Sequence, residues 1–281
     1  EHLFIASTHS YILFFTTSGK VFWIKVHELP QAGRAARGKA IVNLLNLEKD
    51  EKISAFLPVR EFQEGRYIIF ATKNGTGKKT ELMAYSNPRK AGIIAISIDA
   101  GDEVIGVRLT DGQQHVILST REGQAIRFKE EDVRPMGRGA GGVRGIRLEA
   151  GDSVIGVDVV SPGATLLAVA ERGYGKRTEM DEYRLTRRGG RGIITMKTTD
   201  KTGLVVGVRM VTDDDDIMLV TGGGKVIRTP VKGISVIGRN TQGVRLIDLA
   251  EGEKVVGVAC LAEKEEEEGN IILLTDPIDE E

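Results

Sequence analysis

The stretch Val104-Ile105-Gly106-Val107 decides the fold, because close copies of it return at steps of about 50 residues. The copies are Ile53-Ser54-Ala55-Phe56, Val154-Ile155-Gly156-Val157, Val205-Val206-Gly207-Val208 and Val255-Val256-Gly257-Val258. Self-similarity at this period is typical of blade-type arrays rather than of a single wound sheet. A feature that returns five times in register indicates architecture or a shared function.

Each repeat has three parts around this motif. It opens with a β-rich run and a Gly turn, as in 116–123, and a short strand with a basic residue follows. A loop rich in Gly and Arg comes next, as in 137–144, and then an acidic turn such as 101–103 leads into the motif. The strands are short, β-branched and bounded by Gly, Asp and Asn. We find no amphipathic helix of three turns, so the sequence predicts an all-β fold.

One repeat cannot bury its own apolar face, so the repeats must stack, and a radial arrangement leaves only short edges. The complete repeats cover about 11–59, 67–110, 115–160, 165–211 and 216–261. Apolar segments at 3–8 and 271–275 are left over, and a ring that closes by pairing its ends would use them as a partial sixth blade. We therefore predict a single six-bladed domain over 1–261 and an acidic tail over 262–281. The Gly inside four of the five copies of the motif predicts a close backbone approach near the ring centre.

The formal net charge of −1 hides a segregation of charge along the chain. Residues 251–281 hold eleven acids and two bases, which leaves a net charge of +8 on residues 1–250. A basic body with an acidic end favours a polyanionic partner and a tethered competitor, although acidic ends also serve as solubilising tails. Cys260 stands alone, which excludes a disulfide within the chain and is typical of the cytoplasm. No apolar run approaches the ~18 residues of a membrane helix.

Three patterns that suggest other chemistry fail on their context. The Gly-Lys clusters at 75–80 and 175–178 lack the spacing of a phosphate loop and lie between expected strands. The GxGxxG match at 137–142 runs into a strand rather than a helix, which argues against a dinucleotide site. The four acids at 213–216 point in alternating directions, as in a solvated turn. No histidine has ligand spacing and no Ser/His/Asp set clusters, so we expect no catalytic site, cofactor or metal in this chain.

The basic residues return in register with the repeats. Arg or Lys occupies the strand after the Gly turn and the Gly-rich loop of nearly every repeat, which predicts a positively charged track rather than a patch. Gly beside Arg lets backbone amides approach an anion while the guanidinium group bridges phosphate oxygens. Few aromatic side chains are placed to stack on unpaired bases, so duplex backbone binding is favoured. The candidate DNA-binding residues are Arg34, Arg37, Lys39, Lys78, Lys79, Arg89, Lys90, Arg127, Arg138, Arg144, Lys176, Arg177, Arg187, Arg188, Arg191, Lys225, Arg228 and Arg239.

Segments at 29–38, 41–45, 173–178 and 238–244, with the period, resemble a known family. The chain is similar over nearly its whole length to the C-terminal domains of the A subunits of DNA gyrase and of other bacterial type IIA topoisomerases. The resemblance implies a β-pinwheel, which is a propeller-like disc with strands exchanged between neighbouring blades. It also implies that duplex DNA wraps around a basic rim. In gyrase this wrap directs negative supercoiling, with ATP hydrolysed by the B subunit.

The resemblance implies partners as well. They are double-stranded DNA, the breakage-reunion domain that forms the N-terminal part of the A subunit, and the gyrase B subunit in an A2B2 heterotetramer. ATP and Mg belong to the holoenzyme, and none of the tyrosines here matches the family's catalytic tyrosine. The family's box, Gln-Arg-Arg-Gly-Gly-Lys/Arg-Gly, is expected upstream of residue 1. The closest match here is 186–192, with Thr186 in place of Gln, so 187–192 is expected to have only a general rim role.

Three alternatives remain at this point. The homologous domain of topoisomerase IV has a similar repeat but usually fewer blades and no box. A propeller scaffold of the chromosome-condensation-regulator type has a similar period and would bind protein partners on a face of the disc. A propeller enzyme is the least favoured, because no repeated or clustered chemistry is present.

Overall fold

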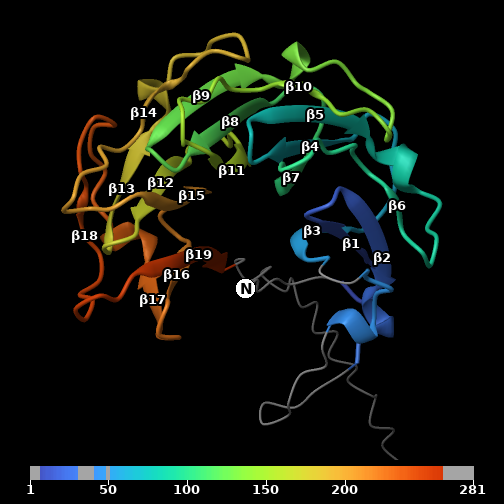
Figure 1. Ribbon diagram of the computed structural model, residues 1–281, viewed down its shortest axis with the longest axis horizontal. Helices are drawn as coiled ribbons and strands as arrows, with labels where there is room; N and C mark the ends of the chain where they lie inside the picture. Colours follow the sequence, from blue (N-terminus) through green and yellow to red (C-terminus); the bar gives the residue numbers. More distant parts are fainter. Residues whose placement is uncertain (1–6, 31–40, 49–50, 262–281) are drawn as a thin grey trace, which may run out of the picture.

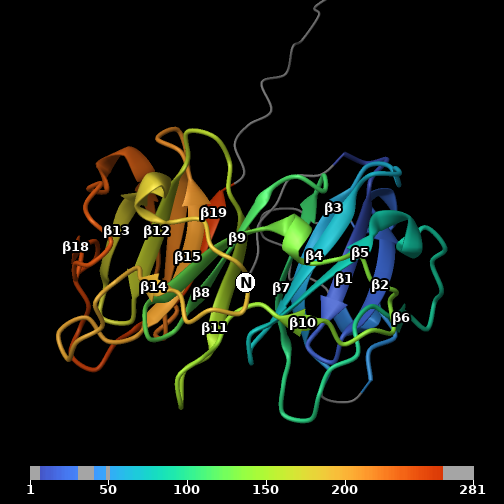
Figure 2. The same cartoon turned by 90° about the horizontal axis from the view of Figure 1, so that it is seen from above.

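The computed structural model describes residues 7–30, 41–48 and 51–261. The described residues form five antiparallel sheets that stand side by side in an arc, with a gap between the first and the fifth (Figure 1). Figure 2 shows the arc from above, with β1 to β5 on one side and β12 to β19 on the other. The predicted all-β blade architecture is confirmed, but the blade number is corrected from six to five. The predicted sixth blade was to use segments 3–8 and 271–275, of which residues 3–6 and 271–275 lie outside the described residues.

Each blade has its motif strand innermost and then a two-stranded hairpin, and in the first four blades a short outer strand follows. The innermost strands are β3 (Ile53–Val59), β7 (Val104–Thr110), β11 (Val154–Val159), β15 (Val205–Val211) and β19 (Val255–Leu261). The hairpins are β1 (Tyr11–Thr16) with β2 (Lys20–Lys25), β4 (Tyr67–Thr72) with β5 (Thr76–Glu81), β8 (His115–Thr120) with β9 (Gln124–Lys129), β12 (Thr165–Ala170) with β13 (Tyr174–Glu179), and β16 (Asp216–Thr221) with β17 (Val226–Pro230).

The outer strands are β6 (Ile93–Ile94), β10 (Val143–Arg144), β14 (Ile193–Ile194) and β18 (Val244–Arg245). Single 3-10 turns connect the elements at Val26–Glu28, Ile41–Asn43, Leu82–Tyr85, Glu130–Asp132, Met180–Glu182 and Val231–Gly233. No helix in the described part of the chain is long and apolar enough to cross a membrane.

The outer strand of a blade comes from the following repeat. β6 belongs to the second repeat, but it pairs with β2 of the first blade, where Ile93 lies opposite Val21. In the same way β10 pairs with β5, β14 with β9 and β18 with β13. The fifth blade has three strands among the described residues, so the outer edge of β17 carries no donated strand there. The strand exchange implied by the resemblance is therefore observed in four blades.

The repeated motif encodes a β-bulge at the inner edge of every blade. In β7, Val104 and Gly106 pair with consecutive residues of β4, so Ile105 is the extra residue. The register shifts at the matching place in the other four blades. A bulge bends its strand and increases the local twist, which suits a strand at the crowded centre of a radial array.

The glycine of the motif makes room for the next blade. A Cβ added to Gly106 would lie 2.9 Å from Val157 Cγ1, and one added to Gly207 would lie 2.8 Å from Val258 Cγ2. The predicted close approach is confirmed, and the neighbouring blade is what comes close. At Gly257, in the last blade, a Cβ would meet nothing within 4 Å among the described residues. This difference agrees with an open arc that ends at the fifth blade.

The apolar core lies between successive blades rather than inside one of them. Leu166 and Ala168 of β12 pack in a cluster with Ile117 of the third blade. Leu167 and Val169 of the same strand face the fifth blade and pack with Ile217 and its neighbours. Every residue of β12 is consequently buried, because both faces of the strand are covered. This explains why the hairpin strands are nearly continuous apolar runs.

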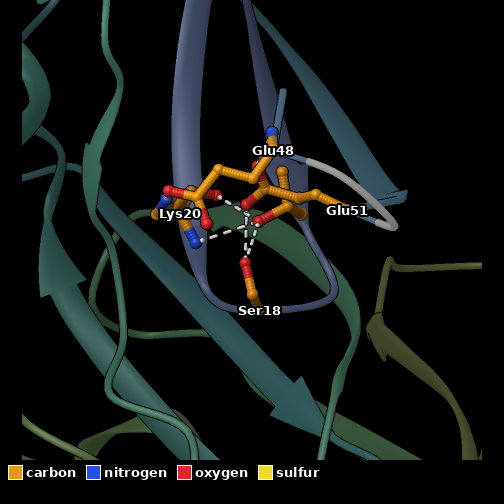
Figure 3. Close-up of polar contacts among 5 residues, drawn as sticks. Ser18, Lys20, Glu48 and Glu51 are labelled. Carbon is orange, nitrogen blue, oxygen red and sulfur yellow. Dashed lines mark hydrogen bonds and ion pairs between the residues drawn. The ribbon is translucent and has the colours of Figure 1, made fainter. Parts of the chain in front are cut away.

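The acidic turns are structural, because each holds a hairpin turn of its own blade. Asp102 Oδ1 accepts a hydrogen bond from the amide of Asn74 at 2.9 Å, and Asp152 Oδ1 accepts one from Glu122 at 2.9 Å. In the first blade, Ser18 donates to Glu51 at 2.6 Å and Lys20 Nζ to Glu48 at 2.5 Å (Figure 3). The hydrogen bond with Glu48 raises the pKa of Lys20.

Candidate nucleic-acid interface

The Gly- and Arg-rich loops lie at the outer edge of the arc. Each loop leads into one of the outer strands β6, β10, β14 and β18, which form the outside of the disc in Figure 1. Strand donation therefore places one basic loop on each of four consecutive blades. We call these the rim loops: residues 87–92, 137–142, 187–192 and 238–243.

Most of the predicted residues on the rim loops and outer strands are exposed. Arg191 has a side chain that is 72% exposed and lies 3.5 Å from a carboxylate oxygen of Glu149, which is itself exposed. An exposed ion pair of this kind is weak, so it leaves the arginine available to a phosphate. The exposed rim residues from the predicted set are Arg89, Lys90, Arg138, Arg144, Arg187 and Arg191.

Rim loop 187–192 forms a basic hollow with β9, the strand that pairs with β14 in the third blade. Arg127, Arg184, Arg187 and Arg191 line a cavity of about 330 Å³ together with the backbone around Gly190. Guanidinium groups that converge with glycine amides suit phosphate, whose oxygens accept bidentate hydrogen bonds. The loop that most resembles the family's box therefore has the chemistry of a phosphate contact in its own right.

Four predicted DNA contacts are corrected by the structure, because their side chains are buried. Lys78 and Lys176 have no exposed surface, and Lys79 and Arg177 are 4% and 5% exposed. Lys79 Nζ donates to the carbonyl oxygen of Glu130, and Arg177 Nε to that of Ile234. A charged group enclosed in this way cannot reach a phosphate outside the protein. The basic residue after the Gly turn holds the neighbouring repeat in place instead.

Three further arginines are half-buried and bind the adjacent repeat. Arg127 donates to the carbonyl oxygen of Met180 at 2.9 Å. Arg188 donates to the carbonyl oxygen of Arg144 at 3.1 Å, and Arg239 to that of Ile194 at 3.1 Å. The last two hydrogen bonds are equivalent, since each joins a rim loop to the preceding outer strand. These arginines connect the rim around the disc, which limits what they can offer to DNA.

On the fifth blade, Lys225 and Arg228 are exposed as predicted for DNA contacts. Arg228 Nε also lies 2.6 Å from Asp216 Oδ2, so part of its charge is neutralised. Three of the acids at 213–216 have separate partners, with Asp213 bound to Arg177, Asp215 accepting from the amide of Thr212 and Asp216 bound to Arg228. Their divergence agrees with the predicted solvated turn. Within residues 7–30, 41–48 and 51–261, no three potential metal ligands lie together.

Two exposed arginines on the rim were missed from the sequence. Arg134 and Arg184 occupy the same position in the third and fourth repeats, two residues after the 3-10 turn and before the rim loop. Aligning the repeats from the 3-10 turn onward would have found them. Arg34, Arg37 and Lys39 lie outside the described residues, as does the acidic tail over 262–281.

A second hollow lies at the hub, where all five innermost strands meet. It measures about 310 Å³, and Arg108, Asp158 and Arg209 line it. Burial lowers the pKa of Arg209, and the charge of Arg108 adds to that effect. Arg108 Nε donates to Asp158 Oδ1 at 2.8 Å and forms an ion pair with it. The ion pair ties the second blade to the third, so these charges have a structural role away from the rim.

The sequence matches the family model described as DNA gyrase C-terminal domain, beta-propeller, over residues 10–60, 66–111, 114–161, 164–212 and 215–262. The chain belongs to this family. It is 49% identical over 268 residues to the A subunit of DNA gyrase from Salmonella typhimurium, in an alignment that covers 95% of this chain and 30% of the relative. The chain thus spans about a third of the length of its curated gyrase relatives, as expected for a domain or piece of a longer protein.

Two solved structures share the arrangement. A DNA gyrase A C-terminal domain superimposes with a TM-score of 0.80 and 29% identity, covering 92% of this chain and 84% of that chain. The C-terminal domain of DNA topoisomerase IV gives a TM-score of 0.82 and 29% identity, covering 90% of this chain and 79% of that chain. The fold alone therefore does not separate gyrase from topoisomerase IV, whereas the family model and the sequence relatives indicate gyrase.

Proposed function

We propose that this chain is a non-catalytic module that binds, bends and wraps double-stranded DNA around the rim of the disc. One observation carries the proposal: strand donation sets a basic loop at the outer edge of four consecutive blades. A duplex that follows this edge meets positive charge blade after blade. Many weak phosphate contacts along a curve supply the free energy that bending costs, about 1–6 kcal/mol for a bend of 40–90°.

In the holoenzyme, the wrap would present a DNA segment for passage and so direct ATP-dependent negative supercoiling. The partners in the cytoplasm would be the gyrase B subunit, together with the breakage-reunion domain that precedes this one in the A subunit. ATP and Mg would act elsewhere in that assembly. Membership of the gyrase family supports this reading over that of a propeller scaffold for protein partners.

The test is energy transfer between dyes on the two ends of a duplex, which rises when the chain bends it. Arg187→Glu with Arg191→Glu reverses two exposed charges on one rim loop. We expect weaker binding and lower energy transfer. The matched control is Lys129→Glu with Lys201→Glu, because both lysines are exposed and lie outside the rim loops. If both double variants lost binding and energy transfer equally, only the net charge of the chain would matter. If neither variant lost binding or energy transfer, the rim would be refuted as the DNA-binding surface.

A topological assay distinguishes the remaining alternatives. The chain is incubated with relaxed circular DNA, the DNA is relaxed again by a type I topoisomerase, and the linking number is read on a gel. A wrap of defined hand shifts the linking number in one direction. A protein-binding scaffold leaves the distribution unchanged, and that result would refute the proposed function.

A further inference from the structure

Two fully buried lysines lie beneath the rim. Lys78 and Lys176 occupy the third position of β5 and β13, the strands that receive β10 and β18. Lysine is almost never completely buried unless its ammonium group is paired or hydrogen-bonded. Neither lysine has a carboxylate within ion-pair distance among the described residues. Their partners explain why they are buried.

Both ammonium groups bind carbonyl oxygens of a rim loop that belongs to the next repeat. Lys176 Nζ donates to the carbonyl oxygens of Gly238 at 2.5 Å and Arg239 at 2.6 Å. Lys78 Nζ donates to the carbonyl oxygen of Arg138 at 2.5 Å and to that of Ala95 at 2.7 Å. Hydrogen bonds from a charged donor are short and strong, and here they end on the backbone of a rim arginine.

The lysine is present only in alternate blades. The equivalent residue is Ile126 in the third blade, which receives rim loop 187–192, and Phe22 in the first blade. Rim loops 137–142 and 238–243 are therefore fixed by an ammonium group from below, whereas the other two rest on apolar side chains. This contrast within one chain offers a matched control.

We propose that Lys78 and Lys176 are positioning residues that hold rim loops 137–142 and 238–243 in the shape that DNA binds. The inference rests on the proposed function and deepens it. A loop that is already ordered loses less conformational entropy when it contacts phosphate. The buried lysines thereby contribute to DNA binding without touching DNA, whereas their sequence pattern suggests that they contact DNA directly.

The charges around each lysine fit this role. Burial, together with the nearby charge of Arg138, lowers the pKa of Lys78 to about 8. Burial also lowers the pKa of Lys176 to about 8, where the charge of Glu182 opposes the effect and that of Arg239 adds to it. Both lysines remain mostly charged at neutral pH, so the strong form of the hydrogen bonds is present when DNA binds.

The experiment replaces each lysine with methionine, which keeps the length of the stem and removes the amine. The variants K78M, K176M and the double variant are compared with I126M, which changes the equivalent core position without removing a donor. Hydrogen exchange reports the order of the loops, and energy transfer on an end-labelled duplex reports bending at saturating protein. All measurements use the full 281-residue chain.

We expect exchange at 137–142 in K78M and at 238–243 in K176M to quicken by about tenfold or more, with 187–192 unchanged. Energy transfer at saturation should fall in both variants and stay at the wild-type level in I126M. A lysine with a purely structural role would lower the urea midpoint but leave energy transfer at saturation unchanged, and that result would overturn the proposal. Unchanged exchange in the rim loops would overturn it as well.

Two outcomes separate this inference from the proposed function. If the wild-type chain does not bend the duplex, the proposed function is refuted. The lysines then have no role in positioning loops for DNA, even if hydrogen exchange in the rim loops is faster in the methionine variants. If the wild-type chain bends DNA and a methionine variant does not fold, Lys78→Gln and Lys176→Gln replace it, since glutamine retains a shorter donor. Intermediate exchange and bending in the glutamine variants would support the proposal, and wild-type values would refute it.

Discussion

Replacing a motif glycine with alanine should destabilise the disc only where a neighbouring blade lies close. At Gly207 the new Cβ would lie 2.8 Å from Val258 Cγ2 and 3.0 Å from its Cβ. Valine is stiff at χ1, so the fifth blade must move. Overpacking of this kind typically costs about 1–3 kcal/mol. Ala55 holds the same place in the first blade, which shows that alanine fits the strand itself.

The matched control is Gly257→Ala, because its Cβ would meet nothing within 4 Å in the described part of the chain. There the substitution should be neutral or stabilising by about 0.4–1 kcal/mol, since it removes freedom from the unfolded chain. Urea unfolding followed by far-UV circular dichroism should therefore separate the two variants by about 1–4 kcal/mol. If both substitutions changed the free energy of unfolding by the same amount, the argument from the neighbouring blade would be refuted.

Three other predictions follow from charge. Affinity for duplex DNA should fall about 10³–10⁵-fold between 50 and 200 mM salt if about 6–10 phosphates are neutralised. The double variant Arg134→Glu with Arg184→Glu should reduce by about 2 the slope of the logarithm of the binding constant against the logarithm of salt concentration. Deleting 262–281 removes a net negative charge and should tighten DNA binding at low salt; unchanged affinity would show that the tail is inert. The free energy of unfolding should rise as pH increases above about 8, because Lys78 and Lys176 lose their protons near pH 8 when folded and near 10.5 when unfolded. The double methionine variant should lack that rise, which urea titrations across this pH range would detect.

The sequence predicted the repeating strands well because their signals are local. Short β-branched runs, Gly turns and acidic turns return at one spacing, and each predicts the same element every time. The bulge at Ile105 and the closeness of Gly106 to Val157 follow from the same motif. A close approach needs a residue without a side chain, so the glycine was a direct sign of it.

The buried lysines could not be found in the same way. Lys78 and Lys79 look like a solvated basic pair, because the loop that covers Lys78 lies some sixty residues further along the chain. Whether a strand residue is buried depends on what packs against it, and here the loop that covers Lys78 belongs to another repeat. One clue was Gly175 just before Lys176, because a Cβ there would lie 2.4 Å from Leu246 Cδ1 at the end of the donated strand.

Strand donation has a mechanical consequence for a protein that would carry a stiff polymer under tension. A rim arginine such as Arg138 is joined covalently to one blade and by hydrogen bonds to the blade before it. A duplex that pulls on such a loop would therefore load both the covalent connection to one blade and the hydrogen bonds to the other. A loop belonging wholly to one blade would instead peel away bond by bond. If the proposed wrapping is correct, the exchange that completes four of the sheets would also spread the recoil of bent DNA over pairs of neighbouring blades.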